Sequence, residues 1–305
     1  MDPNSVVNKR LSDYVNSNEE VIYLDHPSFL YLKNSQAQQY IKLMHQESYS
    51  SEFHSPLVSL IEDKVLSLVD ATLKQVRFVD LGPGYPDKAI PILSHLRRAG
   101  IEVSYCPIDV NPFFLDLARE SVEKITSSIF PIQSLFEEVA HADISKISGV
   151  GQNVSSIIHI GPTFMNYAPS EAFDIMLRMS IPGDRLIIST ELLEDVSIES
   201  AAKIYVSKEV EHFNYMLLSN LGIAISDLRY FVQTNGNCIE MGFTVLRDVA
   251  LNEYRLSKGT QIVTATSRRY GLKDLKSVLE SYFDSYDIYT SIPPSVAISK
   301  IQILE

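Results

Sequence analysis

VRFVDLGPGYPDK, at residues 76–88, is the most informative stretch of this 305-residue chain. Its apolar first half is typical of a buried strand, Gly82 and Gly84 of a tight turn, and Pro86 of a first helical turn. Twenty-five residues after Gly84, a second apolar run ends at Asp109. Glycines let a backbone approach a ligand closely, and an acid that ends the next strand accepts hydrogen bonds from ribose hydroxyls. The spacing therefore predicts a nucleotide-type cofactor site.

The glycine pattern is G-x-G, and it lacks the third glycine of the G-x-G-x-x-G pattern found in dinucleotide sites. Asp87 stands where that third glycine would be. A carboxylate there disfavours a pyrophosphate, which needs a close and uncharged helix N-terminus. The pattern therefore favours S-adenosylmethionine (SAM), which carries ribose and adenine without a pyrophosphate, over NAD.

The composition is that of an ordinary globular protein, with 45% hydrophobic and 21% charged residues. The net charge of -12 and the lack of any Lys/Arg block argue against nucleic acid and anionic membranes as partners. Only Cys106 and Cys238 are cysteines, the N-terminus is polar, and no apolar run approaches about 20 residues. These features predict a cytoplasmic protein. The seven histidines lack metal-site spacing, so no metal is expected, and the oligomeric state stays open.

The centre of the chain predicts an α/β fold built on a Rossmann-like parallel sheet with right-handed crossovers. Apolar strands alternate there with amphipathic helices. The expected strands are 76–81, 103–108, 155–160 and 185–189, and the expected helices are 88–99 and 112–125, the second one N-capped by Asn111. Late strands at 286–290 and 297–304 would complete the sheet, with the final strand antiparallel.

The remaining segments predict a second, inserted α+β lobe. Helices are expected at 35–45, 56–69 and within 196–230, and strands at 238–246 and 260–266 precede a helix at 272–283. The predicted parts are an N-terminal helical segment that contributes to the substrate lobe (1–70), a SAM-binding domain (71–195), an inserted substrate-binding lobe (196–275) and C-terminal sheet strands (276–305).

Six segments in chain order resemble motifs of the SAM-dependent histidine-specific methyltransferase family, whose known member makes the trimethylated histidine precursor of ergothioneine. They cover most of the chain. They are DLGPG with Lys88 (80–88), PIDV (107–110), GPTFMNY (161–167), FN (213–214), IEM (239–241) and IVTATS (262–267). The resemblance implies a SAM methyltransferase fold and methyl transfer to a small amino-acid-like molecule.

The resemblance also implies roles for single residues. On the cofactor side it assigns SAM binding to Gly82, Gly84, Lys88, Asp109 and, near the family's adenine-binding pair, Ser134. On the acceptor side it assigns substrate contacts to Tyr49, Asn166, Tyr205, Met241, Ala265 and Ser267. Tyr205 and Asn166 are also the candidates for taking part in removal of the amine proton. For Lys88 a solvated side chain is the simpler alternative, and for the pair Arg268-Arg269 a solvated face is favoured over a carboxylate site.

Two departures from the family pattern bear on the substrate. The family's substrate-reading Glu falls on Ala265, and its glycine before Asn166 is Met165. An imidazole N–H needs an acceptor, which alanine does not offer, and a missing partner of this kind can cost several orders of magnitude in discrimination. Histidine is therefore not the expected substrate. Transfer of the aminocarboxypropyl group of SAM, or a SAM-binding partner protein without turnover, are the alternatives that the sequence leaves open.

Overall fold

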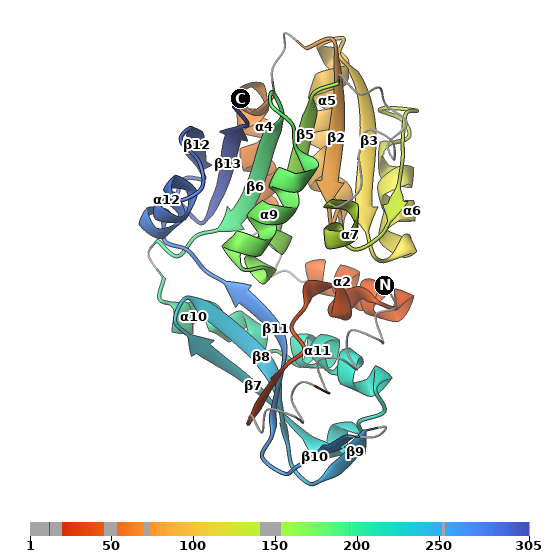
Figure 1. Cartoon of the computed structure of the whole chain (residues 1–305), viewed down its shortest axis with the longest axis vertical. Coiled ribbons are helices and arrows are strands. Elements are labelled where there is room, and N and C mark those ends of the chain that lie inside the picture. The colour runs from red at the N-terminus through yellow and green to blue at the C-terminus, as the bar shows by residue number, and fades with distance from the viewer. Residues whose placement is uncertain are drawn as a thin grey trace. The chain divides into compact units, whose positions relative to one another are not determined.

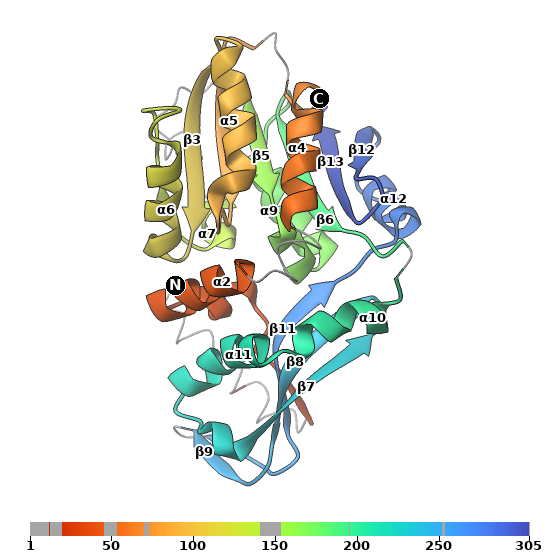
Figure 2. The ribbon, with the colours of Figure 1, turned by 180° about the vertical axis from the view of Figure 1, so that it is seen from behind.

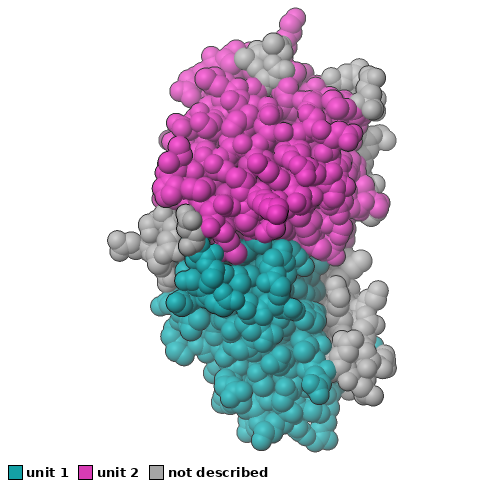
Figure 3. Space-filling model, turned by 90° about the vertical axis from the view of Figure 1, so that its left-hand side faces the viewer, with its two compact units in different colours: residues 1–43, 195–269 teal, residues 44–194, 270–305 magenta. Residues whose placement is uncertain are grey.

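The computed structural model describes residues 12, 20–45, 54–69, 73–140, 154–194, 196–251 and 254–304. The chain forms two compact units, which Figure 3 colours separately. Unit 1 consists of residues 1–43 and 195–269, and unit 2 of residues 44–194 and 270–305. Among the described residues, no helix is both long and apolar enough to cross a membrane.

Unit 2 is built on a seven-stranded sheet in the order β12-β13-β6-β5-β2-β3-β4 (Figure 1). The five strands β4, β3, β2, β5 and β6, which are neighbours in the sheet in that order, are parallel to one another, whereas β13 runs antiparallel to both β6 and β12. The strands are β2 (Gln75–Leu81), β3 (Glu102–Asp109), β4 (Ile132–Gln133), β5 (Ser156–Ile160), β6 (Arg185–Glu191), β12 (Tyr286–Thr290) and β13 (Val296–Gln302). The predicted α/β fold, its parallel sheet and its antiparallel last strand are confirmed.

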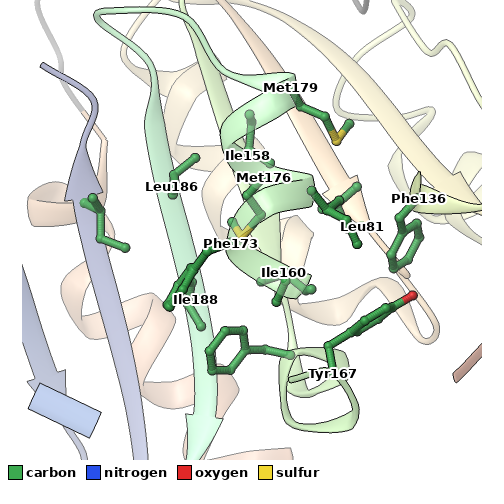
Figure 4. Close-up of a cluster of buried hydrophobic side chains, with 14 of the residues drawn as sticks. Leu81, Phe136, Ile158, Ile160, Tyr167, Phe173, Met176, Met179, Leu186 and Ile188 are labelled. Carbon is green, nitrogen blue, oxygen red and sulfur yellow. The ribbon is translucent and has the colours of Figure 1, made fainter. Parts of the chain in front are cut away.

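Helices cover both faces of this sheet, which explains why its strands are nearly continuous apolar runs (Figure 2). One face packs against α4 (Ser55–Leu68), α5 (Ala89–Arg98) and α6 (Pro112–Val122). The other packs against α7 (Phe136–Ala140), α9 (Pro169–Met179) and α12 (Leu272–Glu280), and Figure 4 shows part of that core. The expected N-cap is present, because Asn111 Oδ1 accepts the N–H of Phe113 at 2.9 Å.

Unit 1 contains a four-stranded sheet in the order β1-β11-β8-β7, in which only the β1–β11 pair is parallel. One side of this sheet packs against α11 (Lys208–Asn220). The strands are β1 (Val21–Tyr23), β7 (Leu228–Asn235), β8 (Cys238–Val245) and β11 (Gln261–Arg268), with a separate pair, β9 (Val249–Leu251) and β10 (Tyr254–Leu256). The helices are η1 (Pro27–Tyr31), α2 (Asn34–Met44), α10 (Ile198–Ala202), η5 (Lys203–Val206), α11 (Lys208–Asn220) and η6 (Ile225–Asp227).

Three features differ from the sequence expectation. The helical reading of 196–230 is wrong at its end, because β7 begins at Leu228 and pairs with β8 through a two-residue turn that contains Gly236 at φ 60°. β1 lies in a region expected to be mainly helical. The segment 1–70 is not one part, since the apolar face of α4 packs in the core of unit 2 together with α5.

Candidate functional site

The glycine turn after β2 has the backbone that its sequence predicts. Gly82 and Gly84 have φ values of 67° and 51°, in the left-handed region that glycine adopts without strain. A Cβ added at Gly82 would lie 3.2 Å from Thr163 Oγ1 and 3.3 Å from Phe136 Cζ. The N–H of Gly82 donates to the carbonyl of Ile108 at 2.9 Å, which ties the turn to the end of β3. The left-handed conformation therefore favours glycine at Gly82, and the space for a side chain there is tight.

Asp109 ends β3 with its side chain buried. Its Oδ1 accepts the backbone N–H of Asn111 at 2.9 Å. Burial raises the pKa of Asp109 to about 7, and the nearby charge of Asp80 adds to this, although backbone hydrogen bonds from Asn111 and Val110 oppose it. A buried acid that lacks full solvation is suited to accept hydroxyl donors from a ligand.

Ser134 lies directly beside Asp109. Its N–H donates to the carbonyl of Asp109 at 3.1 Å, and its hydroxyl donates to Glu138 Oε2 at 3.0 Å. The sequence reading did not include Glu138, which lies in the short helix α7 that begins two residues after Ser134. This polar pair follows β4, at the same edge of the sheet as Asp109.

Lys88 lies in η3 (Pro86–Lys88), directly after the glycine turn. Its side chain is only 8% exposed, so the simple alternative of a solvated lysine is wrong. The ammonium donates to the carbonyl of Tyr85 at 3.2 Å and to Asp87 Oδ1 at 3.4 Å. A Cβ at Gly161 would lie 3.5 Å from Lys88 Cε, so the lysine chain also contacts the end of β5.

Asn166 ends η4 (Pro162–Asn166), the turn that follows β5, and is partly buried. The preceding Met165 is buried, and its sulfur accepts the N–H of Glu191 at 3.5 Å. Because β2, β3 and β5 are parallel, their carboxyl ends meet at one edge of the sheet, where open α/β sheets bind their ligands. Glycine turn, lysine, acid and amide thus gather at this edge. Asp109 offers an acceptor for ribose hydroxyls and Lys88 offers a cation for a carboxylate, and SAM carries both of these groups.

A buried chain of polar groups supports this edge from inside the sheet. Asp80 accepts hydrogen bonds from the Tyr105 hydroxyl and from His159 Nδ1, both at 2.9 Å, and His159 Nε2 lies 3.3 Å from the hydroxyl of Ser189. The Ser-His-Asp order resembles a hydrolase triad, but Ser189 is fully buried in mid-strand. These residues therefore brace β2, β5 and β6 below the glycine turn.

The acceptor candidates other than Asn166 that the structure describes lie in unit 1. Met241 on β8 and Ala265 on β11 are direct cross-strand neighbours, and both are buried. They belong to a cluster of apolar and aromatic side chains. Its other members are Leu30, Leu43, Val210 and Phe213, with Tyr31, Tyr40, Tyr205, Tyr230 and Val232 partly buried against them. Tyr49 lies outside the described residues.

Arg269 joins two of these candidates. Its guanidinium donates to the hydroxyl of Ser267 at 2.7 Å and to the hydroxyl of Tyr205, and its carbon lies 5.6 Å from the centre of the Tyr205 ring. Arg269 is 2% exposed, so its expected place on a solvated face is wrong. The signal that sequence reasoning missed is the alternation of Ala265, Ser267 and Arg269, which extends one side of β11 past its last residue.

Asn214 and Glu240, which also belong to the resembling motifs, form hydrogen bonds within unit 1. Buried Asn214 accepts a hydrogen bond from the Thr264 hydroxyl at 3.0 Å and donates to the carbonyl of Val210 at 3.0 Å, so it ties α11 to β11. Glu240 precedes Met241 and therefore faces the opposite side of the sheet. It accepts hydrogen bonds from the side-chain amides of Gln233 at 2.8 Å and Asn235 at 3.0 Å.

The sequence matches the family described as histidine-specific methyltransferase, SAM-dependent, over residues 40–291. The chain belongs to this family. SAM is accordingly its cofactor, and methyl transfer is its class of reaction. The matched range contains the glycine turn, Asp109 and Ala265, that is, residues of both units.

No curated protein matches the sequence. Similar solved structures include the CMeT domain of the citrinin polyketide synthase, at 13% identity, 99% of this chain, 64% of that chain and a TM-score of 0.48. The CurJ carbon methyltransferase matches at 12% identity, 100% and 72% of the two chains and a TM-score of 0.45. An rRNA methylase from Streptococcus thermophilus matches at 12% identity, over 81% of this chain and 97% of that chain, with a TM-score of 0.34. The chain spans 64% of the first of these proteins.

Proposed function

We propose that this methyltransferase transfers a methyl group from SAM to an amine nitrogen of a small, amino-acid-like molecule other than histidine, in the cytoplasm. The observation that carries the cofactor half of the proposal is the single edge formed by the glycine turn, Lys88 and Asp109. In this proposal Asp109 accepts the ribose hydroxyls, Lys88 holds the SAM carboxylate, and Gly82 and Gly84 allow close backbone approach. Ser134 contributes on the adenine side.

The position of Ala265 supports an acceptor other than histidine. Its methyl group offers no acceptor for an imidazole N–H, and its cross-strand neighbour Met241 offers only a thioether sulfur, which is a weak acceptor. The nearest acid along β8, Glu240, belongs to the other side of the sheet and is already held by two amides. An imidazole N–H placed against Ala265 would lack a carboxylate partner at this position, which disfavours its binding.

The chain's own residues have a positioning task. SAM supplies an activated methyl group on a sulfonium that is itself the leaving group, so catalysis depends mainly on aligning donor and acceptor. An ammonium has no lone pair, and the acceptor must therefore react as a neutral amine. We assign Tyr205, Asn166 and Ser267 to holding the acceptor, and the Tyr205 hydroxyl or a water near Asn166 to taking part in the release of the amine proton to solvent.

The test is mass spectrometry of reactions with SAM and a panel of amino acids and related amines that includes histidine. The expected result is a product heavier by one or more methyl groups with an amine other than histidine, lost in Asp109→Ala and Asn166→Ala. Histidine as the preferred acceptor would refute the substrate assignment. A mass gain of an aminocarboxypropyl group would refute methyl transfer, and SAM binding without any turnover would point to a binding partner protein.

A further inference from the structure

His54, directly before the first residue of α4, contacts the cofactor turn through Asp87. Its Nε2 forms a hydrogen bond with Asp87 Oδ2, while the other carboxylate oxygen lies 3.4 Å from the ammonium of Lys88. The His54 side chain is 14% exposed and that of Asp87 22%, so the pair is largely removed from water. The ring of His54 also meets the ring of Tyr85 edge-on, at 6.4 Å between centroids.

Asp87 creates an electrostatic problem for the proposed cofactor site. It places a carboxylate next to the lysine that would hold the carboxylate of SAM, so it competes for that ammonium and repels the carboxylate of the ligand. Burial alone would raise the pKa of Asp87, but the hydrogen bond from His54 and the charge of Lys88 outweigh it and lower that pKa. Asp87 is therefore ionised, and its charge has to be held by a partner.

We propose that His54 is a positioning residue that holds the Asp87 carboxylate and so keeps the Lys88 ammonium available to the carboxylate of SAM. This inference rests on the proposed role of Lys88. His54 takes one carboxylate oxygen, and the longer Asp87–Lys88 contact leaves the lysine fixed at the turn by the carbonyl of Tyr85. An ammonium has three N–H donors, so a ligand carboxylate adds to these two contacts without replacing them.

The test uses two probes that differ in the aminocarboxypropyl arm. S-adenosylhomocysteine carries this arm with its carboxylate and its amine, whereas 5′-methylthioadenosine has the same adenine and ribose with a methyl group in place of the arm. Calorimetry of wild type, His54→Phe, Asp87→Asn and the double variant measures both affinities. His54→Phe retains a ring against Tyr85 and removes only the hydrogen bond, and Lys88→Met serves as the reference for loss of the carboxylate contact.

His54→Phe is expected to bind S-adenosylhomocysteine about tenfold more weakly, at the low end of the contribution of a charge-assisted hydrogen bond, and 5′-methylthioadenosine unchanged. Adding Asp87→Asn to His54→Phe is expected to restore the lost affinity, because a neutral side chain at position 87 no longer competes for the ammonium of Lys88. Equal losses for both probes, no loss at all, or no restoration in the double variant would overturn the inference. Wild-type protein that binds neither probe would instead overturn the proposed cofactor site.

Discussion

Asp109→Asn is expected to stabilise the ligand-free protein at alkaline pH. In the folded chain the pKa of Asp109 is about 7, against an ordinary value of 3.8. At about 1.4 kcal/mol per pH unit, ionising this buried carboxyl costs the folded state about 4 kcal/mol once the pH exceeds 7. Because the folded pKa is raised, the unfolded chain ionises first, and stability is lost as the pH rises from about 4 to about 7. Asparagine does not titrate and avoids this loss.

Urea denaturation at pH 5.5 and pH 8.5 measures the effect. About 2 kcal/mol of the difference between wild type and Asp109→Asn is expected to develop over that range, with the variant the more stable at pH 8.5. The matched control is Ser134→Ala, which changes a neighbour at the same edge without removing a titrating group. A difference between wild type and Asp109→Asn that does not change with pH would refute the reasoning.

The same group makes cofactor affinity depend on pH in the opposite direction. Ribose hydroxyls donate to an ionised carboxylate, so binding of S-adenosylhomocysteine to wild type is expected to strengthen up to tenfold per pH unit below 7 and to level off above it. Asp109→Asn is expected to bind more weakly and without this slope, whereas Ser134→Ala keeps the slope. Calorimetry at several pH values decides this, and a wild-type affinity that is flat between pH 5.5 and 8.5 would contradict the role of Asp109.

Three further results are expected. Gly82→Ala should lose about 1–2 kcal/mol of stability because its φ is 67°, and it should also lose affinity for S-adenosylhomocysteine. The control is Gly100→Ala, which has a φ of 74° and open space around it and should lose stability alone. Arg269→Gln should raise KM for the acceptor found in the panel about tenfold and leave cofactor affinity unchanged. Arg269→Lys should have a KM between those of wild type and Arg269→Gln. Equal effects on acceptor and cofactor would contradict a role of Arg269 in acceptor binding. Ala265→Glu should lower stability by about 3 kcal/mol or more, measured by urea denaturation, because it buries a carboxylate in an apolar cluster, and a variant as stable as wild type would show room and solvent there.

The sheet of unit 2 could be predicted because its physical signals are local. Strands buried on both faces are continuous apolar runs, and Gly82 and Asp109 stand directly at strand ends. The sequence of a helix carries no such local signal for the surface against which the helix packs. The apolar face of α4 would serve either unit equally well, and the sequence does not say that it packs with α5. The edge strand β7 was missed for a related reason, since its side chains are mostly only partly buried and show little alternation.

Ion pairs and hydrogen bonds between distant segments were also beyond sequence reasoning. Thirty-three residues separate His54 from Asp87, and sixty-four separate Tyr205 from Arg269. A charged residue in such a sequence is most often solvated, which is why Arg269 was expected on the surface. Only the fold shows that a buried cation follows β11 and joins a hydroxyl of its own strand to one from η5.

The meaning of Ala265 depends on strand register, which motif resemblance alone does not contain. β11 has a bulge, because Val263 pairs with Gly242 and Ala265 with Met241, which leaves Thr264 as the extra residue. Without that bulge the alternation of side chains along β11 would be shifted by one position, and a threonine hydroxyl would stand where the family's glutamate is expected. With the bulge, a methyl group stands there instead, and Thr264 donates its hydroxyl to Asn214. The local backbone irregularity therefore decides which side chain an acceptor would meet.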